Sequence, residues 1–259
     1  MTCMQRSIRT MESGRALSWE EIKAWRKSLR ASLIGAREAA PEAGRKAWNE
    51  TIGERLFEGF RMPDETVVGY CWPFKGEFDA RFVVRRWRDE GAVAALPAVV
   101  DPKGPLEFRK WWPGAPMKPG VYGIPVPEGT EVVVPDVAIV PMNAFDGGGY
   151  RLGYGGGYFD RTLAACGRRM AAIGIAYEML RVETIHPQPH DVPMDFVVTE
   201  GGVFAGGGKP LAKLDGEESR RRFAALLSAR RLPRAAYPDT GYSSPACYAA
   251  DFPGYFGKK

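Results

Sequence analysis

A stretch between Pro141 and Arg161 combines the residue types that bind anions and metal ions. It contains seven glycines, with Arg151 among them and Asp160 at their end. Glycines adopt positive φ and let backbone N–H groups approach an anion, and successive N–H groups form concave anion-binding turns. An arginine and a carboxylate beside such turns suit a phosphate group and its metal ion. We therefore predict a phosphate-binding loop here.

Two familiar phosphate loops do not fit this stretch. A Walker A loop ends in Gly-Lys-Ser/Thr, and no such triplet follows the glycines. A dinucleotide-binding loop directly follows a strand, whereas Gly153, Gly155 and Gly157 come after an arginine and a long polar lead. The remaining alternative is a glycine-rich surface hairpin without a ligand, and the charges that bracket the glycines favour the binding loop.

A second candidate for anion binding is the helix expected over residues 18–40. Ser18 and Glu21 form a capping box at its start, and Pro41 ends it. Arg26 and Arg30 lie one turn apart, with further basic residues, Lys23 and Arg37, near the same face. These guanidiniums could clamp a phosphate, but charge runs on helices are commonly solvated, and the residues alone favour a solvated basic face. The expected buried stripe is Ile22, Trp25, Leu29, Leu33 and Ala36.

The third candidate is the loop over residues 186–195, where His186, His190, Asp191 and Asp195 could suggest zinc. The intervening prolines prevent a helix, so the spacing of four does not place both imidazoles on one face. Magnesium prefers one or two carboxylates completed by phosphate oxygens and water. The aspartates therefore favour magnesium over zinc.

Short apolar runs alternate with helical patterns along the chain, which predicts an α/β fold. Helices are expected over residues 18–40, 42–60, 79–90, 158–167 and 219–231, a short helical piece over 178–185, and strands over 67–72, 92–100, 106–112, 135–140, 171–177 and 196–199. The Pro- and Gly-rich segment 113–130 is expected to be an ordered loop that covers the site. Ligands of open α/β sheets bind beyond the carboxyl ends of strands, so the glycine loop, the loop containing Glu77 and the loop containing Asp191 are expected to meet there.

The composition is that of an ordinary soluble globular protein, without a membrane span. A net charge of +5 over 259 residues is too mild for a dedicated nucleic-acid binder. The four cysteines show no paired spacing, which favours a reducing cytoplasm. We expect a disordered tail over residues 1–17, an α/β domain over 18–214, and a basic helix with an aromatic, Pro-rich arm over 215–259. The arm either docks a partner or packs on its own body.

The residues resemble the signature of the 5-formyltetrahydrofolate cyclo-ligase family, also called methenyltetrahydrofolate synthetases. The matching positions are Pro141, Ala144, Phe145, Asp146, Gly149, Arg151, Leu152, Gly153, Gly155, Gly157, Tyr158, Asp160 and Arg161. The basic helix around Arg26 and Arg30, the loop from Phe74 to Asp79 and the segment from His190 to Asp195 extend the resemblance. It covers roughly residues 20–201.

The resemblance implies a three-layer α/β/α fold with a Rossmann-like sheet, similar to that of sugar-phosphate isomerases and coenzyme A transferases. It implies an ATP-dependent ligase that uses Mg2+ to convert 5-formyltetrahydrofolate to 5,10-methenyltetrahydrofolate, with release of ADP and phosphate. The formyl oxygen attacks the γ-phosphate, and N10 closes on the activated formyl carbon. The folate could be polyglutamylated, and a monomer or weak homodimer is expected.

The resemblance also assigns site residues. The ATP-binding set is Arg26, Lys27, Ser28, Leu29, Arg30, Arg151, Leu152, Gly153, Tyr154, Gly155, Gly156, Gly157, Tyr158 and Phe159. The substrate-binding set is Arg30, Phe74, Glu77, Asp79, Tyr154, Gly155, Gly156, Gly157 and Tyr158. Asp160 and Asp191 are the magnesium ligands, and Arg151 is the catalytic residue.

The sequence departs from the family pattern at three places. Arg26 replaces a frequent lysine, Phe159 replaces a frequent second tyrosine, and Val126-Pro127 replaces a frequent Glu-Pro. These departures leave open a nucleotide-binding paralogue of the same fold without cyclo-ligase activity. The basic C-terminal helix leaves open a protein that binds RNA or a partner chain.

Overall fold

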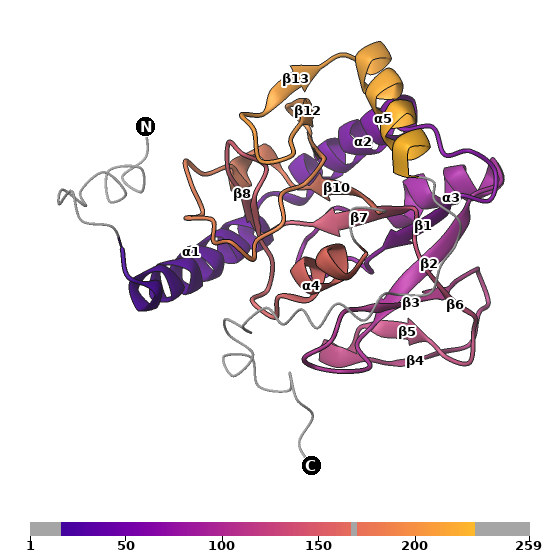
Figure 1. The fold of residues 1–259 in the computed structure, drawn as a ribbon, viewed down its shortest axis with the longest axis horizontal. Coiled ribbons are helices and arrows are strands. Elements are labelled where there is room, and N and C mark those ends of the chain that lie inside the picture. The colour runs from indigo at the N-terminus through magenta and orange to yellow at the C-terminus, as the bar shows by residue number, and fades with distance from the viewer. Residues whose placement is uncertain (1–16, 167–169, 231–259) are drawn as a thin grey trace.

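The structure is a computed structural model that describes residues 17–166 and 170–230 (Figure 1). The helices are α1 (Trp19–Ala39), α2 (Glu42–Gly59), α3 (Arg81–Asp89), α4 (Tyr158–Ala165) and α5 (Gly216–Arg230), with two 3-10 turns, η2 (Val121–Gly123) and η3 (Glu178–Leu180). The strands are β1 (Val67–Tyr70), β2 (Val93–Ala98), β3 (Glu107–Lys110), β4 (Met117–Pro119), β5 (Pro125–Pro127), β6 (Val132–Val133), β7 (Val137–Pro141), β8 (Ala144–Phe145), β9 (Arg151–Leu152), β10 (Ala171–Ile175), β11 (Phe196–Thr199), β12 (Gly202–Ala205) and β13 (Ala212–Leu214).

Nine strands form one mixed sheet in the order β13-β12-β11-β10-β7-β1-β2-β3-β6. The five strands from β11 to β2 pair in parallel, and the strands at both edges pair antiparallel. The residues of β1, β10 and β11 are all buried, as expected for strands covered on both faces. The predicted α/β class is therefore confirmed.

The chain winds outward from the centre of this sheet in both directions. It passes from β1 through α3 to β2 on one side, and from β7 through α4 to β10 on the other. Right-handed crossovers that run in opposite directions place α3 and α4 on opposite faces of the sheet. In Figure 1, α2, α3 and α5 gather on one side of the central strands, apart from α4. The order of the strands therefore reverses between β1 and β7, where open α/β sheets bind ligands.

Helix α5 is part of the main hydrophobic core. Its Phe223 is 1% exposed and packs edge-on against Phe60, at a distance of 5.1 Å between ring centroids. On α2, Ile52 and Leu56 are fully buried at the predicted spacing of four. The helical part of the C-terminal segment thus packs on its own body, while residues 231–259, like the N-terminal tail, lie outside the described residues.

The structure corrects the predicted orientation of α1. Its capping box is present, with the Glu21 N–H donating to Ser18 Oγ at 3.3 Å. The buried positions, however, are Ile22, Arg26, Arg30, Ile34 and Arg37. The interpretation as a solvated basic face is wrong, because this face turns toward polar groups of distant loops. The predicted apolar stripe is only partly buried beyond Ile22 and contributes Leu29 and Leu33 to a small satellite core cluster.

Local structure also differs from the predictions in three segments. The first three glycines of the 141–161 stretch lie in a hairpin between β8 and β9 rather than in one continuous loop. Segment 113–130 contains the short hairpin of β4 and β5. Strands β12 and β13 were not expected, because glycines lie at the start of β12 and between the two strands. Among the described residues, no helix has the length and apolar character needed to cross a membrane.

Candidate active site

A cavity of about 210 Å³ lies where the strand order reverses. Its walls come from the segments that follow β1, β2 and β7, from the glycine loop, and from the loop containing Asp191. Arg26 and Arg30 of α1 and the residues at the start of α4 complete it. The structure thus brings together side chains from the first helix, the glycine stretch and the C-terminal core.

Two glycines give the loop before α4 its shape. Gly155 and Gly157 have φ values of 98° and 65°, which a residue with a Cβ adopts only with strain. Gly157 is the N-cap of α4, and no side chain caps this helix. Residues 157–160 line the cavity, so the amino-terminal end of α4 faces it. Uncapped N–H groups and the helix dipole make this end a site for an anion.

The first group of glycines does not reach the cavity. Asp146 Oδ1 accepts hydrogen bonds from the N–H groups of Gly148 and Tyr150, at 2.9 and 3.1 Å. Asp146 Oδ2 accepts one from the N–H of Ile185 at 3.2 Å. This aspartate therefore closes the β8–β9 hairpin and ties it to the following segment, which is a structural role.

The two arginines of α1 are held by carbonyl and carboxylate groups far along the chain. Arg26 donates to the carbonyl of Ile185 at 3.0 Å and to that of His186 at 2.9 Å, and it pairs with Asp191 at 2.5 Å. Arg30 donates to the carbonyl of Gly153 at 2.6 Å. Both guanidiniums are nearly completely buried and line the cavity. They supply fixed positive charge beside the glycine loop.

Arg151 and Asp160 form an ion pair at 3.0 Å across the glycine loop. Arg151 also donates to the carbonyl of Val192 at 2.7 Å, and Asp160 Oδ1 accepts from the Val192 N–H at 3.0 Å. These contacts with the backbone N–H and carbonyl of one residue fix both side chains relative to the loop that contains Asp191. The arrangement holds a cation and a carboxylate on the edge of the cavity, beside the start of α4.

The carboxylates offer limited room for a metal ion. No group of three or more His, Cys, Asp and Glu side chains suited to a metal occurs within residues 17–166 and 170–230. Asp191 uses its two oxygens for Arg26 and for the Gln188 N–H at 2.7 Å. For Asp160, every hydrogen bond within the described residues goes to Oδ1. Such a donor set fits magnesium that takes most of its ligands from phosphates and water.

An aromatic part of the cavity wall carries one acid. Glu77 accepts hydrogen bonds from the Tyr154 hydroxyl at 2.8 Å and from the Phe74 N–H at 3.1 Å. Phe74 and Tyr154 meet edge to face, with 5.7 Å between ring centroids. Burial raises the pKa of Glu77, and the guanidinium of Arg37 opposes this effect. Burial also raises the pKa of the Tyr154 phenol, which keeps it protonated as a donor.

An apolar lobe adjoins this wall. Its residues come from the ends of β2 and β5 and from the connecting loops, namely Leu96, Pro97, Val99, Leu106, Val121, Ile124, Pro125 and Val126. Val126, at one of the departures from the family pattern, therefore lines the cavity. An apolar lobe beside aromatic rings and a carboxylate suits a flat ring system with polar edges.

Four residues of the predicted sets do not line the cavity. Lys27 and Ser28 are exposed on the outer side of α1, and Leu29 packs in the satellite core cluster. Side chains four residues apart lie on the same face of a helix, so only Arg26 and Arg30 of the predicted run 26–30 point toward the cavity. Asp79 accepts from the Arg81 guanidinium at 2.6 Å and from the Arg81 N–H at 3.1 Å, so its carboxylate is occupied by the first residue of α3.

Some residues that shape the site were absent from the predicted sets. Trp72 and His190 line the cavity, and Arg37 lies behind its aromatic wall. Trp72 follows a buried strand and His190 precedes Asp191, so their positions at strand carboxyl ends were the available signal. Arg37 lies two turns after Arg30, but its burial depends on contacts with residues more than 100 positions away.

The sequence profile of the 5-formyltetrahydrofolate cyclo-ligase family matches residues 22–200. The 5-formyltetrahydrofolate cyclo-ligase of Haemophilus influenzae is 33% identical over 183 residues, which cover 68% of this chain and 94% of that protein. The enzyme of the same name from Mycolicibacterium smegmatis is 30% identical over 187 residues, which cover 68% of this chain and 95% of that protein.

Solved structures show the same fold. The 5,10-methenyltetrahydrofolate synthetase of Aquifex aeolicus superimposes with a TM-score of 0.58 at 27% identity, over 73% of this chain and 96% of that one. The synthetase of Mycoplasma pneumoniae gives a TM-score of 0.56 at 22% identity, over 68% of this chain and 98% of that one. The predicted Rossmann-like architecture agrees with these likenesses.

Proposed function

The chain belongs to the 5-formyltetrahydrofolate cyclo-ligase family, and on that premise we propose that it converts 5-formyltetrahydrofolate to 5,10-methenyltetrahydrofolate at the expense of ATP. The observation that carries this proposal is the shared cavity. Its lining includes a helix amino terminus and arginines for phosphates, and also aromatic rings and Glu77 for a heterocycle. A phosphoryl donor and a folate could therefore meet in one cavity.

The arginines and the glycine loop position the phosphates of ATP. Arg151, Arg30 and the N–H groups at the start of α4 stabilise negative charge on the γ-phosphoryl group as it moves. The formyl oxygen of the folate attacks the γ-phosphorus, and ADP leaves. N10 then attacks the activated formyl carbon and loses its proton to solvent, and the C–O bond breaks as phosphate departs with the former formyl oxygen. This chemistry asks the protein mainly for positioning and charge, which the buried arginines provide.

Phe74, Glu77 and Tyr154 receive the pterin ring. The carboxylate of Glu77 accepts hydrogen bonds from ring N–H and amino groups, and the aromatic side chains pack on the ring faces. The Tyr154 hydroxyl and the Phe74 N–H hold this carboxylate in place. Their geometry supports a folate site that exists before the substrate arrives.

Asp160 and Asp191 would hold magnesium together with phosphate oxygens. When bound, the ion neutralises charge on the phosphates. Oδ2 of Asp160 is the better placed ligand, because Asp191 is already paired with Arg26. The ion is therefore expected to arrive with ATP rather than to remain as a resident metal.

The same proposal includes the form of the folate, the cellular compartment and the partners of the enzyme. The folate carries one or several glutamate residues, and a net charge of +5 suits such an anion. Among the described residues, Cys71 and Cys166 form no disulfide, which supports a cytoplasmic enzyme. An RNA-binding role for α5 is less favoured, since Arg221 and Arg222 pair with Glu218, and Arg230 pairs with Asp195.

The test is direct turnover of the purified protein. With 5-formyltetrahydrofolate, ATP and magnesium, we expect the near-ultraviolet absorbance of the methenyl product to grow, with one ADP released per product. Omitting ATP serves as the control. Intact ATP binding without product would contradict the proposal and favour a nucleotide-binding paralogue.

A further inference from the structure

Arg37 is a buried arginine with polar contacts to three separate segments of the site. Its side chain is 1% exposed. Nε donates to the carbonyl of Lys75 at 2.9 Å, Nη1 to Asn143 Oδ1 at 2.8 Å, and Nη2 to the Tyr154 hydroxyl at 3.0 Å. The same guanidinium lies 3.9 Å from the carboxylate of Glu77. Burying a guanidinium costs desolvation free energy, which only well-placed partners can offset. The partners of Arg37 therefore indicate its role.

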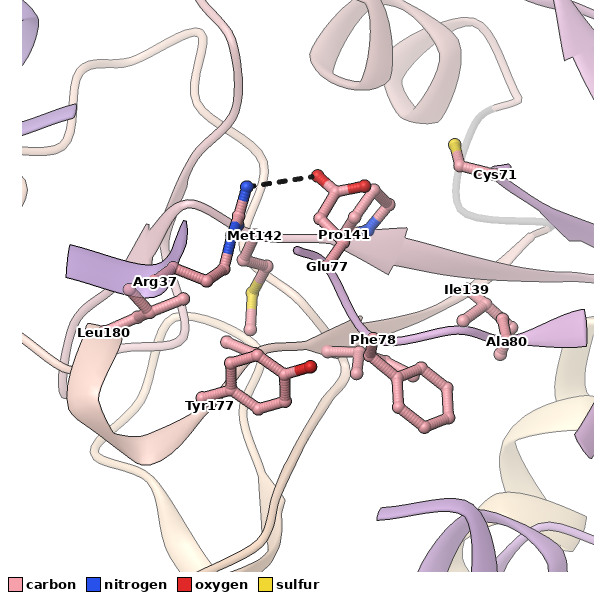
Figure 2. Close-up of a pocket in the computed structure, with 12 residues that line it drawn as sticks. Arg37, Cys71, Glu77, Phe78, Ala80, Ile139, Pro141, Met142, Tyr177 and Leu180 are labelled. Atoms are coloured by element: carbon pink, nitrogen blue, oxygen red, sulfur yellow. Dashed lines mark ion pairs between the residues drawn. The ribbon is translucent and has the colours of Figure 1, made fainter. Parts of the chain in front are cut away.

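Arg37 lies behind the aromatic wall rather than inside the main cavity. It lines a separate cavity of about 20 Å³, which is enough for about one water molecule. Glu77 lines both cavities and forms part of the partition between them. Figure 2 shows the ion pair between Arg37 and Glu77 at this partition. A substrate in the larger cavity would contact Glu77 and Tyr154, with Arg37 on their far side.

The contact with Lys75 fixes an unfavourable turn. Lys75 and Gly76 have φ values of 49° and 72°, so two consecutive residues adopt the left-handed conformation. Lysine disfavours this conformation, and neighbouring contacts must hold it. The hydrogen bond from Arg37 to the Lys75 carbonyl lies within the turn that connects Phe74 to Glu77. Arg37 therefore sets both the path of this loop and the place of its acid.

We propose that Arg37 is a positioning residue for folate binding, which holds the Glu77 carboxyl group in place and orients Tyr154 without contacting the substrate. This inference rests on the proposed function. It adds a second residue of α1 to the folate side of the reaction, where Arg30 is already expected.

The electrostatics give the inference its distinguishing test. Glu77 faces Arg37 of α1, Tyr154 of the glycine loop and Cys71 at the end of β1, and Tyr177 lines the small cavity beside them. Burial raises the pKa of Glu77, and Arg37 lowers it. Without Arg37 this pKa rises further, so the protonated form of Glu77 extends to higher pH. Folate binding that needs the carboxylate is then weak at low pH and recovers as pH increases.

The experiment measures steady-state kinetics of Arg37→Met from pH 6 to 9, with each substrate varied in turn. We expect KM for 5-formyltetrahydrofolate to rise about tenfold or more near neutral pH, and to fall toward the wild-type value at high pH. KM for ATP should stay within about twofold. Arg37→Lys keeps the charge but lacks the planar fork, so we expect partial rescue.

Arg230→Met is the matched control. Arg230 is largely buried and pairs with Asp195 at 2.7 Å, but neither residue lines the cavity. Its loss should lower the melting temperature without changing the pH dependence of KM for the folate. If Arg37→Met behaves like this control, or raises both KM values equally, Arg37 is structural and the inference is wrong.

Two further outcomes keep the inference separate from the proposed function. If Arg37→Met does not fold, Arg37→Lys decides, and an unchanged KM for the folate in that variant contradicts the inference. If the wild-type protein makes no methenyl product, the proposed function fails instead. The binding of 5-formyltetrahydrofolate, followed by quenching of the intrinsic tryptophan fluorescence, to which Trp72 in the cavity wall contributes, or by calorimetry, then tests Arg37 by the same pH dependence.

Discussion

At the level of single residues, arginines hold the site together. Arg26, Arg30, Arg37 and Arg151 are each at most 6% exposed, and each joins segments that are far apart in sequence. Each donates to at least one backbone carbonyl, and Arg26, Arg37 and Arg151 also lie within 4 Å of a carboxylate. A site that handles several phosphate charges can therefore keep its cations fixed before ATP binds.

Arg151 is the arginine whose loss should affect catalysis most. We expect Arg151→Ala to lower kcat/KM at least about 100-fold, because a fixed cation at the transferring phosphoryl group is removed. Circular dichroism should show a folded protein. Arg221→Ala, on the exposed side of α5, is the control and should retain full activity. Unchanged activity in Arg151→Ala would remove this arginine from the mechanism.

Asp160 is the residue to test for metal binding. Asp160→Asn keeps an acceptor for the Val192 N–H but loses the negative charge. The magnesium concentration for half-maximal activity should therefore rise several-fold, since an amide oxygen is a weaker ligand for this ion. Asp195→Asn serves as the comparison, because Asp195 pairs with Arg230 away from the cavity. Identical magnesium titrations of wild type and Asp160→Asn would count against metal ligation.

At the level of elements, the start of α4 depends on one glycine. Gly157 adopts φ 65° as the N-cap, and a Cβ there costs about 1 kcal/mol of stability. We expect Gly157→Ala to raise KM for ATP, because the helix amino terminus shifts relative to the cavity. Steady-state kinetics measure this effect.

Gly147→Ala is a suitable comparison for this change. Gly147 lies in the same glycine-rich stretch, but it has a negative φ and open space around its Cβ position. Its substitution should leave KM for ATP unchanged. If both substitutions changed KM for ATP equally, the effect of Gly157→Ala would not come from the amino terminus of α4.

The elements also show what the sequence could predict. The central strands and α2 were predictable because apolar periodicity decides their burial, as at Ile52 and Leu56. Helix α1 was misjudged because its leucines and its arginines both repeat at helical spacing. The arginine face is the buried one because its hydrogen-bond acceptors, such as the Gly153 carbonyl, belong to segments more than 100 residues away in the sequence. No local pattern encodes such partners.

The same reasoning applies to the site. The glycine loop with Arg151 and Asp160 was predictable from residue types that lie close together in sequence. The hairpin role of Asp146 and the partition formed by Arg37 and Glu77 were not, because each needs two loops in their folded positions. The departure of Val126 was visible in sequence, but its place on the cavity wall depends on the β4–β5 hairpin.

At the level of the whole molecule, the core extends from the sheet to α5. Phe223 packs against Phe60 and Phe196, so Phe223→Ala should lower the free energy of unfolding by about 3–5 kcal/mol. Chemical denaturation measures this loss. Arg222→Ala, on the exposed side of the same helix, should change stability by less than about 0.5 kcal/mol.

The activity of the folded fraction should survive the loss of Phe223, because α5 contributes no residue to the cavity. A stability loss near that of the Arg222 control would show that α5 is only loosely attached. An inactive but stably folded Phe223→Ala protein would instead link α5 to the site.

Helix α1 is held mainly by its arginines and by a small satellite core cluster, rather than by a broad apolar face. Its detachment would expose little hydrophobic surface, so local opening of α1 should need less free energy than global unfolding. Every such opening would separate Arg26 from Asp191, Arg30 from the glycine loop and Arg37 from Glu77. ATP and folate would then bind the docked state alone, and their presence should slow amide hydrogen exchange in this helix.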